Sequence, residues 1–156
     1  MDNPMTRQED ATLYFADAFT CSQSVFTVFG KDMGLTVDQC LKIGNAFGGG
    51  MARQQFTCGA VTGALMVIGL IFGRGLNDDL TKKEFTYDKV IEFFTEFRKR
   101  NGSVNCRELL RGFNMNDPEE LKQIEELELF QTSCVKYVQD AVEIVEQLIG
   151  AGNKAK

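Results

Sequence analysis

Histidine is absent from this sequence of 156 residues, whereas cysteine occurs five times. Without an imidazole side chain, the protein cannot build a Ser-His-Asp triad, a Cys-His pair or a histidine-ligated metal site. Any metal ion in this protein must therefore be held by sulfur, supplemented at most by carboxylate or backbone oxygen. A chain of this length buries enough surface to fold without disulfides, so the cysteines are not needed as cross-links that stabilise the fold.

Basic residues are also relatively few, because 17 lysines and arginines face 22 aspartates and glutamates, a net charge of −5. This balance disfavours the phosphate backbone of nucleic acids and anionic membrane surfaces as binding partners. We therefore expect no nucleic-acid partner.

The chain shows neither a leader pattern nor a long apolar run. Its first residues, MDNPMTRQEDATLYF, carry acids early and no basic segment followed by an apolar one, so we expect no secretory signal and a cytoplasmic protein. The longest apolar run, 60–72, is interrupted by Thr62, Gly63 and Gly69. It is shorter than the about 20 residues that cross a bilayer. We expect a buried core helix there and no membrane insertion.

The fold class follows from the spacing of apolar residues. Few stretches alternate with the two-residue period of a strand, and the apolar positions recur with helical spacing. Glycines and capping residues divide them into eight segments: 8–19, 21–30, 37–47, 58–72, 86–100, 106–112, 118–128 and 132–149. The sequence predicts an all-α protein, a bundle of about six to eight short helices in a single domain covering residues 1–156.

Four of the five cysteines share one predicted position, in the first turn of a helix and directly after a residue type that caps helices. They are Cys21, Cys58, Cys106 and Cys134, which follow Thr20, Thr57, Asn105 and Ser133. The N-terminus of a helix carries about half a positive charge and free N–H groups, which lower the pKa of a thiol. Each of the four also begins an apolar stripe, so we expect them to point inward and to form a thiolate centre.

Four further residues have predicted roles. Cys40 lies a turn into its helix and is expected to be structural packing. Gly59 and Gly63 lie four residues apart on one helix face, where another backbone can approach closely. Arg53, in the glycine-rich segment GGGMAR, is expected in a tight turn that adds positive charge near the cysteines.

The spacing of the cysteines matches no simple metal or redox motif. No CxxC is present, which excludes zinc-ribbon and thioredoxin patterns, and ferredoxin spacing is missing as well. Any site must therefore be assembled by the fold.

The segment CGAVTG at 58–63, preceded by GGGMAR at 48–53 and followed by ALMVIGL at 64–70, resembles the family of redox-active proteins named for the pattern C_GCAxxG_C_C. The resemblance extends to CSQSVF at 21–26, to Cys106 ahead of a Leu-Leu pair and to the late Cys134. It implies that Cys21, Cys58, Cys106 and Cys134 are the four family cysteines, with Cys40 outside the pattern. A similar region of the split-Soret cytochromes has been suggested to hold an iron–sulfur centre, but this chain lacks the CxxCH motif of covalent haem attachment.

Several functions remain open on these grounds. The four cysteines can bind an iron–sulfur cluster, most simply [2Fe-2S], that exchanges electrons with a redox partner protein, or they can hold zinc, with Gly59 and Arg53 in support. They can instead cycle between thiol and disulfide, with Cys58 as the expected nucleophile. The chain can also be a non-catalytic helical interaction module with core cysteines. Its 13 phenylalanines leave apolar surface for a homodimer.

Overall fold

The structure, a computed structural model, describes residues 3–154 and is all-α. Its helices are α1 (Arg7–Ala16), α2 (Cys21–Gly30), α3 (Val37–Asn45), α4 (Gly48–Met51), α5 (Gly59–Phe72), α6 (Leu80–Asn101), α7 (Cys106–Leu109), α8 (Pro118–Glu126), the π-turn η1 (Phe130–Cys134) and α9 (Val135–Lys154). In the described part, extended pairing is limited to a single bridge between Thr57 and Asn105. The predicted fold class is confirmed. None of the described helices is long and apolar enough to traverse a bilayer.

Side chains of capping residues define where several helices begin. Thr6, Thr20 and Thr36 each close a capping box with the residue three positions later, at the starts of α1, α2 and α3. The prediction was wrong for α6, which begins at Leu80 rather than at residue 86. Asp79 caps it there by accepting a hydrogen bond of 2.9 Å from the Thr81 N–H.

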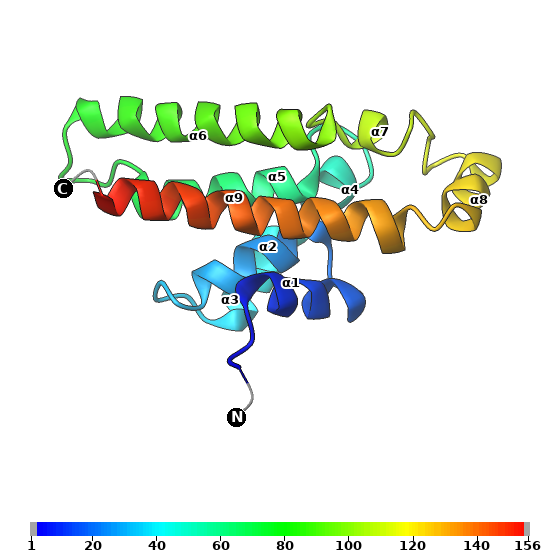
Figure 1. The fold of residues 1–156 in the computed structure, drawn as a ribbon, viewed down its shortest axis with the longest axis horizontal. Helices are drawn as coiled ribbons and strands as arrows, with labels where there is room; N and C mark the ends of the chain where they lie inside the picture. Colours follow the sequence, from blue (N-terminus) through cyan, green and yellow to red (C-terminus); the bar gives the residue numbers. More distant parts are fainter. Residues whose placement is uncertain (1–2, 155–156) are drawn as a thin grey trace.

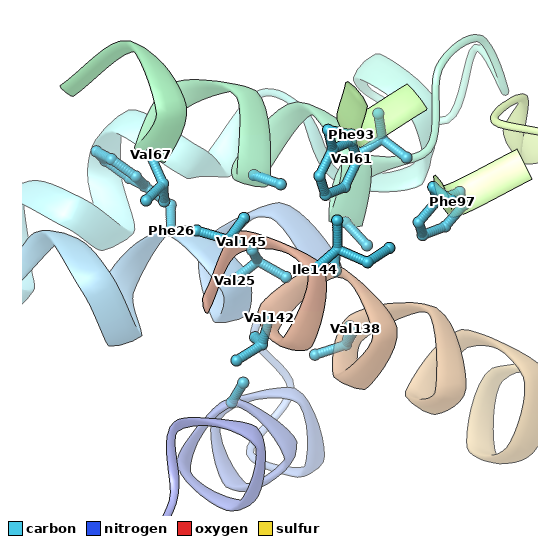
Figure 2. Close-up of a cluster of buried hydrophobic side chains, with 14 of the residues drawn as sticks. Val25, Phe26, Val61, Val67, Phe93, Phe97, Val138, Val142, Ile144 and Val145 are labelled. Carbon is cyan, nitrogen blue, oxygen red and sulfur yellow. The ribbon is translucent and has the colours of Figure 1, made fainter. Parts of the chain in front are cut away.

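Helix α2 is the centre of the bundle, packed against α1, α3, α5 and α9 (Figure 1). Its residues from Ser22 to Gly30 are all buried. Figure 2 shows the apolar core between α2, α5, α6 and α9, and these residues contribute to it: Val25, Phe26, Val61, Val67, Phe93, Phe97, Val138, Val142, Ile144 and Val145.

Helices α2 and α5 cross at very close range, as the two glycines predicted. A Cβ on Gly63 would lie 2.8 Å from the carbonyl oxygen of Ser22, and one on Gly59 would lie 3.1 Å from the Ser22 nitrogen. Only glycine permits this approach, which brings the N-terminal ends of α2 and α5 together.

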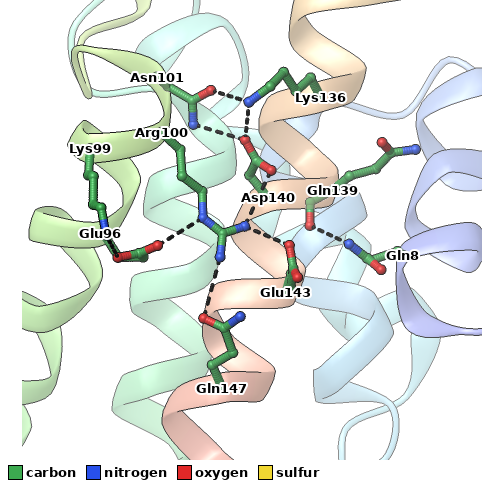
Figure 3. Close-up of polar contacts among 10 residues, drawn as sticks. All are labelled: Gln8, Glu96, Lys99, Arg100, Asn101, Lys136, Gln139, Asp140, Glu143 and Gln147. Carbon is green, nitrogen blue, oxygen red and sulfur yellow. Dashed lines mark hydrogen bonds and ion pairs between the residues drawn. The ribbon is translucent and has the colours of Figure 1, made fainter.

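A polar network joins the C-terminal end of α6 to α9 (Figure 3). The Arg100 guanidinium bridges Glu96 of its own helix, at 3.1 Å, to Glu143 of α9, at 2.6 Å. Beside it, Lys136 donates to Asn101 at 2.8 Å and pairs with Asp140. These contacts fix the long α6 against α9 and so orient the chain that leaves α6 toward Cys106.

Candidate functional site

The four predicted cysteines line one cavity of about 360 Å³, at the end of the bundle where α4 and α7 lie (Figure 1). Each comes from a different part of the chain. The cavity is also lined by Phe15, Thr20, Asn45, Gly48, Gly49, Arg53, Gly59, Leu109, Leu110, Met115, Phe130 and Tyr137. Its walls are therefore mostly apolar, and Arg53 is the only charged side chain among them.

Cys21 and Cys106 are each the first residue of a helix, whereas Cys58 is the N-cap of α5. The Cys58 N–H donates to the Val104 carbonyl at 2.8 Å, and the Cys106 N–H donates to the Phe56 carbonyl at 2.6 Å. This short two-sided pairing joins the start of α5 to the start of α7, so it fixes these two thiols relative to one another.

Cys134 does not begin a helix, and this part of the prediction was wrong. It ends η1, which continues directly into α9, and its N–H donates to the Leu129 carbonyl at 3.0 Å. Because that N–H is used within the helical segment, Cys134 has no positive helix end to stabilise a thiolate. Its side chain nevertheless faces the cavity.

Cys21 is the one cysteine of the cavity whose pKa is lowered. A hydrogen bond from the Cys58 thiol is the largest cause, and it brings the pKa of Cys21 to about 7 against the opposing effect of burial. The backbone N–H groups of Gly49 and Ser22 contribute as well. The pKa of Cys58 is raised well above its ordinary value, because its thiol proton serves Cys21 and because it is buried.

The other two thiols stay protonated in the metal-free protein. Burial raises the pKa of Cys106 to about 12, with a further effect of the negative charge on Cys21. Burial likewise raises the pKa of Cys134. The expected lowering of all four pKa values therefore holds only for Cys21. Its pKa falls because it accepts the hydrogen bond from the Cys58 thiol, whereas burial raises the pKa values of Cys106 and Cys134 without such a bond.

A left-handed backbone segment forms one wall of the cavity. The φ angles of Gly49, Gly50, Met51, Ala52 and Arg53 all lie between 51° and 69°. Left-handed backbone is unfavourable for the three non-glycine residues, so it is kept in place by its surroundings. A Cβ on Gly50 would lie 2.8 Å from the Cβ of Cys106, which explains glycine there. The segment carries Arg53 to the cavity, as predicted.

Cys40 lies apart from the cavity. It is fully buried within the main core, where its Sγ fills the space left by the missing side chain of Gly30. Burial raises the pKa of this thiol. The cavity thus contains the four cysteines of the pattern and not the fifth.

Comparison with protein families matches residues 19–148 to the family described as "Putative redox-active protein (C_GCAxxG_C_C)". The chain belongs to this family. Neither the curated proteins nor the solved structures provide a match. The matched range includes all four cavity cysteines, Gly59 and Arg53, so the family pattern and the cavity coincide.

Three residues around these family cysteines were missed from the sequence. Gln55 is buried, donates to the Phe113 carbonyl at 2.9 Å and accepts from the Met115 N–H at 2.9 Å. It thereby holds Met115 against the cavity. The Tyr137 hydroxyl donates to the Leu109 carbonyl at 3.0 Å and so joins α9 to α7. Of the three, only Tyr137 could have been found from the sequence, because it lies one turn after Cys134 on the same helix face.

Proposed function

We propose that this protein transfers electrons by means of an iron–sulfur cluster bound in the cavity by Cys21, Cys58, Cys106 and Cys134. The observation that carries the proposal is the convergence of four thiols from four separate elements on one apolar cavity. Thiol–disulfide exchange requires only two cysteines, whereas [2Fe-2S] and [4Fe-4S] clusters are held by four.

The donor set and its surroundings fit such a group. The sequence offers no histidine, so thiolate is the strongest donor at the cavity. Within residues 3–154, no three Cys, Asp or Glu side chains are close enough together to hold a single metal ion. A bound cluster would supply one-electron oxidation and reduction.

The residues around the thiols have separate roles in this proposal. Cys21 is the thiolate that exists before loading, because the Gly49 and Ser22 N–H groups and the Cys58 thiol stabilise its charge. Gly59 leaves the space that the Cys21 sulfur occupies. Leu109, Leu110 and the aromatic rings exclude water, and Arg53 offers positive charge to the net negative charge of four thiolates.

The test is anaerobic reconstitution of the full chain with iron and sulfide, followed by absorption spectra and analysis of both elements. We expect visible absorption bands and about two iron and two sulfide per chain for [2Fe-2S]. Alanine at Cys21, Cys58, Cys106 or Cys134 should lower the retained iron, while Cys40→Ala is the matched control and should retain it. Colourless wild-type protein without iron after reconstitution would overturn the proposal.

A second candidate is thiol–disulfide exchange by Cys21 and Cys58, favoured by their hydrogen bond and the lowered pKa of Cys21. The Cys21 thiolate attacks a small disulfide, forms a mixed disulfide and releases one thiolate. Cys58 then gives up its proton and attacks the Cys21 sulfur, which forms the Cys21–Cys58 disulfide and releases the second thiol. The nucleophile is Cys21 rather than the expected Cys58, because the thiolate forms on Cys21.

Treatment of the metal-free protein with oxidised glutathione tests this second candidate. Peptide mass mapping should find the Cys21–Cys58 disulfide, and Cys21→Ala should abolish the mixed disulfide while Cys40→Ala leaves it unchanged. Five reduced thiols in folded protein at an oxidising potential would rule out the exchange.

A further inference from the structure

The outer face of α6 carries a row of exposed apolar side chains. Helix α6 packs against α5 and α9 with one side (Figure 1), and Phe93 and Phe97 are fully buried there. Outside that packed side, Leu80 is 67% exposed, Tyr87 is 53% exposed and Ile91 is 61% exposed, and Ile91 also borders a groove toward Ile144 and Leu148 of α9. Residues spaced by seven and four positions share one face of a helix, so these three form a continuous stripe.

Two charges lie on this stripe at equal distances from Ile91, with Glu84 between Leu80 and Tyr87 and Arg98 beyond Ile91. Glu84 lies seven residues before Ile91 and Arg98 lies seven residues after it, and both side chains are exposed. A step of seven residues returns to nearly the same face of a helix, so both belong to the stripe. The Arg98 guanidinium lies 5.1 Å from the centre of the Phe94 ring, which keeps it on the helix surface.

From this symmetry we propose that the protein forms a dimer in which the outer faces of two α6 helices pack antiparallel. A two-fold axis at Ile91 places Glu84 opposite the partner's Arg98, and the same pair recurs on the other side of the axis. Ile91 then packs against its own counterpart on the axis, and Tyr87 lies opposite the partner's Thr95, as the reversed register of an isologous interface requires. A parallel pair would instead place like charges opposite one another, which is unfavourable.

The order of charges identifies a second copy as the occupant. One face that carries opposite charges at equal distances from an apolar centre is complementary to itself when reversed. The stripe from Leu80 to Arg98 spans about 27 Å, at about 1.5 Å per residue. Because Cys106 lies beyond the C-terminal end of α6, the dimer leaves the two cavities at opposite ends and open to other partners. The dimer does not depend on the proposed function.

Sedimentation velocity of the full chain over a range of concentrations tests the dimer. We expect a dimer for the wild-type protein and a shift to monomer for Ile91→Asp, with an affinity loss of about tenfold or more from the charge buried at the axis. Ile43→Asp, at an exposed isoleucine of α3, is the matched control and should remain dimeric. Helical circular dichroism confirms that each variant folds.

A charge exchange then tests the antiparallel register. Glu84→Arg and Arg98→Glu should each weaken the dimer, and the double variant should restore it because each opposite pair is re-formed with its signs reversed. A monomeric wild-type protein, or a dimer that survives Ile91→Asp, would overturn the proposal. Additive losses in the double variant would overturn the register.

Discussion

Gly59 lies directly against the sulfur of Cys21, in space that any side chain would fill. A Cβ at this position would overlap the Cys21 Sγ and would lie 3.1 Å from the Phe47 carbonyl oxygen. The glycine is therefore required by the site as well as by the crossing of α2 and α5. The backbone at Gly59 therefore sets the position of Cys21, the thiol with the lowered pKa.

Gly59→Ala should destabilise the protein by about 1–3 kcal/mol, because the added methyl group has no room. It should also displace the Cys21 thiol, which alkylation kinetics will detect. Gly69→Ala on the same helix is the control, since nothing lies within 4 Å of its Cβ position. Alanine there should be neutral or stabilise the fold by up to about 1 kcal/mol. Equal denaturant midpoints for the two variants would contradict the overlap.

The reactivity of Cys21 should depend on pH with a midpoint near its pKa of about 7. Only the thiolate is nucleophilic, so alkylation by iodoacetamide should speed up as pH rises through this value and level off above it. In Cys58→Ala the midpoint should move upward, because the thiol that donates to Cys21 is lost. Cys40→Ala should leave the midpoint in place. A single midpoint near the ordinary thiol pKa for all five cysteines would contradict the hydrogen bond.

Gln55 should support the cavity wall indirectly, through its hydrogen bond to Met115. Gln55→Ala leaves the Met115 N–H and the Phe113 carbonyl without their partner, so we expect a loss of about 1–3 kcal/mol in unfolding free energy. The loop that carries Met115 should also exchange its amide hydrogens faster. Gln54→Ala, at the exposed neighbouring residue, should change neither quantity. A stable Gln55→Ala protein with an unchanged loop would show that the two hydrogen bonds do not hold the cavity wall.

The sequence predicted the fold class, most helix boundaries and the set of four cysteines, because these depend on local periodicity, capping residues and glycine. It did not predict the ionisation of the thiols. The pKa of Cys58 is raised mainly by its hydrogen bond to Cys21, and those of Cys106 and Cys134 mainly by burial, and both effects come from segments distant in the sequence.

The left-handed run from Gly49 to Arg53 was also beyond local prediction. Propensity favours such backbone only at glycine, whereas Met51, Ala52 and Arg53 are held in it by contacts that form only in the folded chain. The role of Gln55 could not be predicted locally either, because its hydrogen-bond partners lie about sixty residues away in the sequence.

Arg100 should be the arginine that matters most for the packing of α6 against α9. Its side chain is only 21% exposed, and its guanidinium contacts Glu96, Asp140 and Glu143. Removing it leaves three carboxylates close together, so Arg100→Met should lower the unfolding free energy by about 1–2 kcal/mol, less at high salt because ions screen their repulsion. Lys99→Met removes a neighbouring cation that is 77% exposed, and it should cost less than about 0.5 kcal/mol. Urea denaturation at low and high salt measures the unfolding free energies of both variants. Equal losses for Arg100→Met and Lys99→Met would show that the apolar core alone holds α6 against α9.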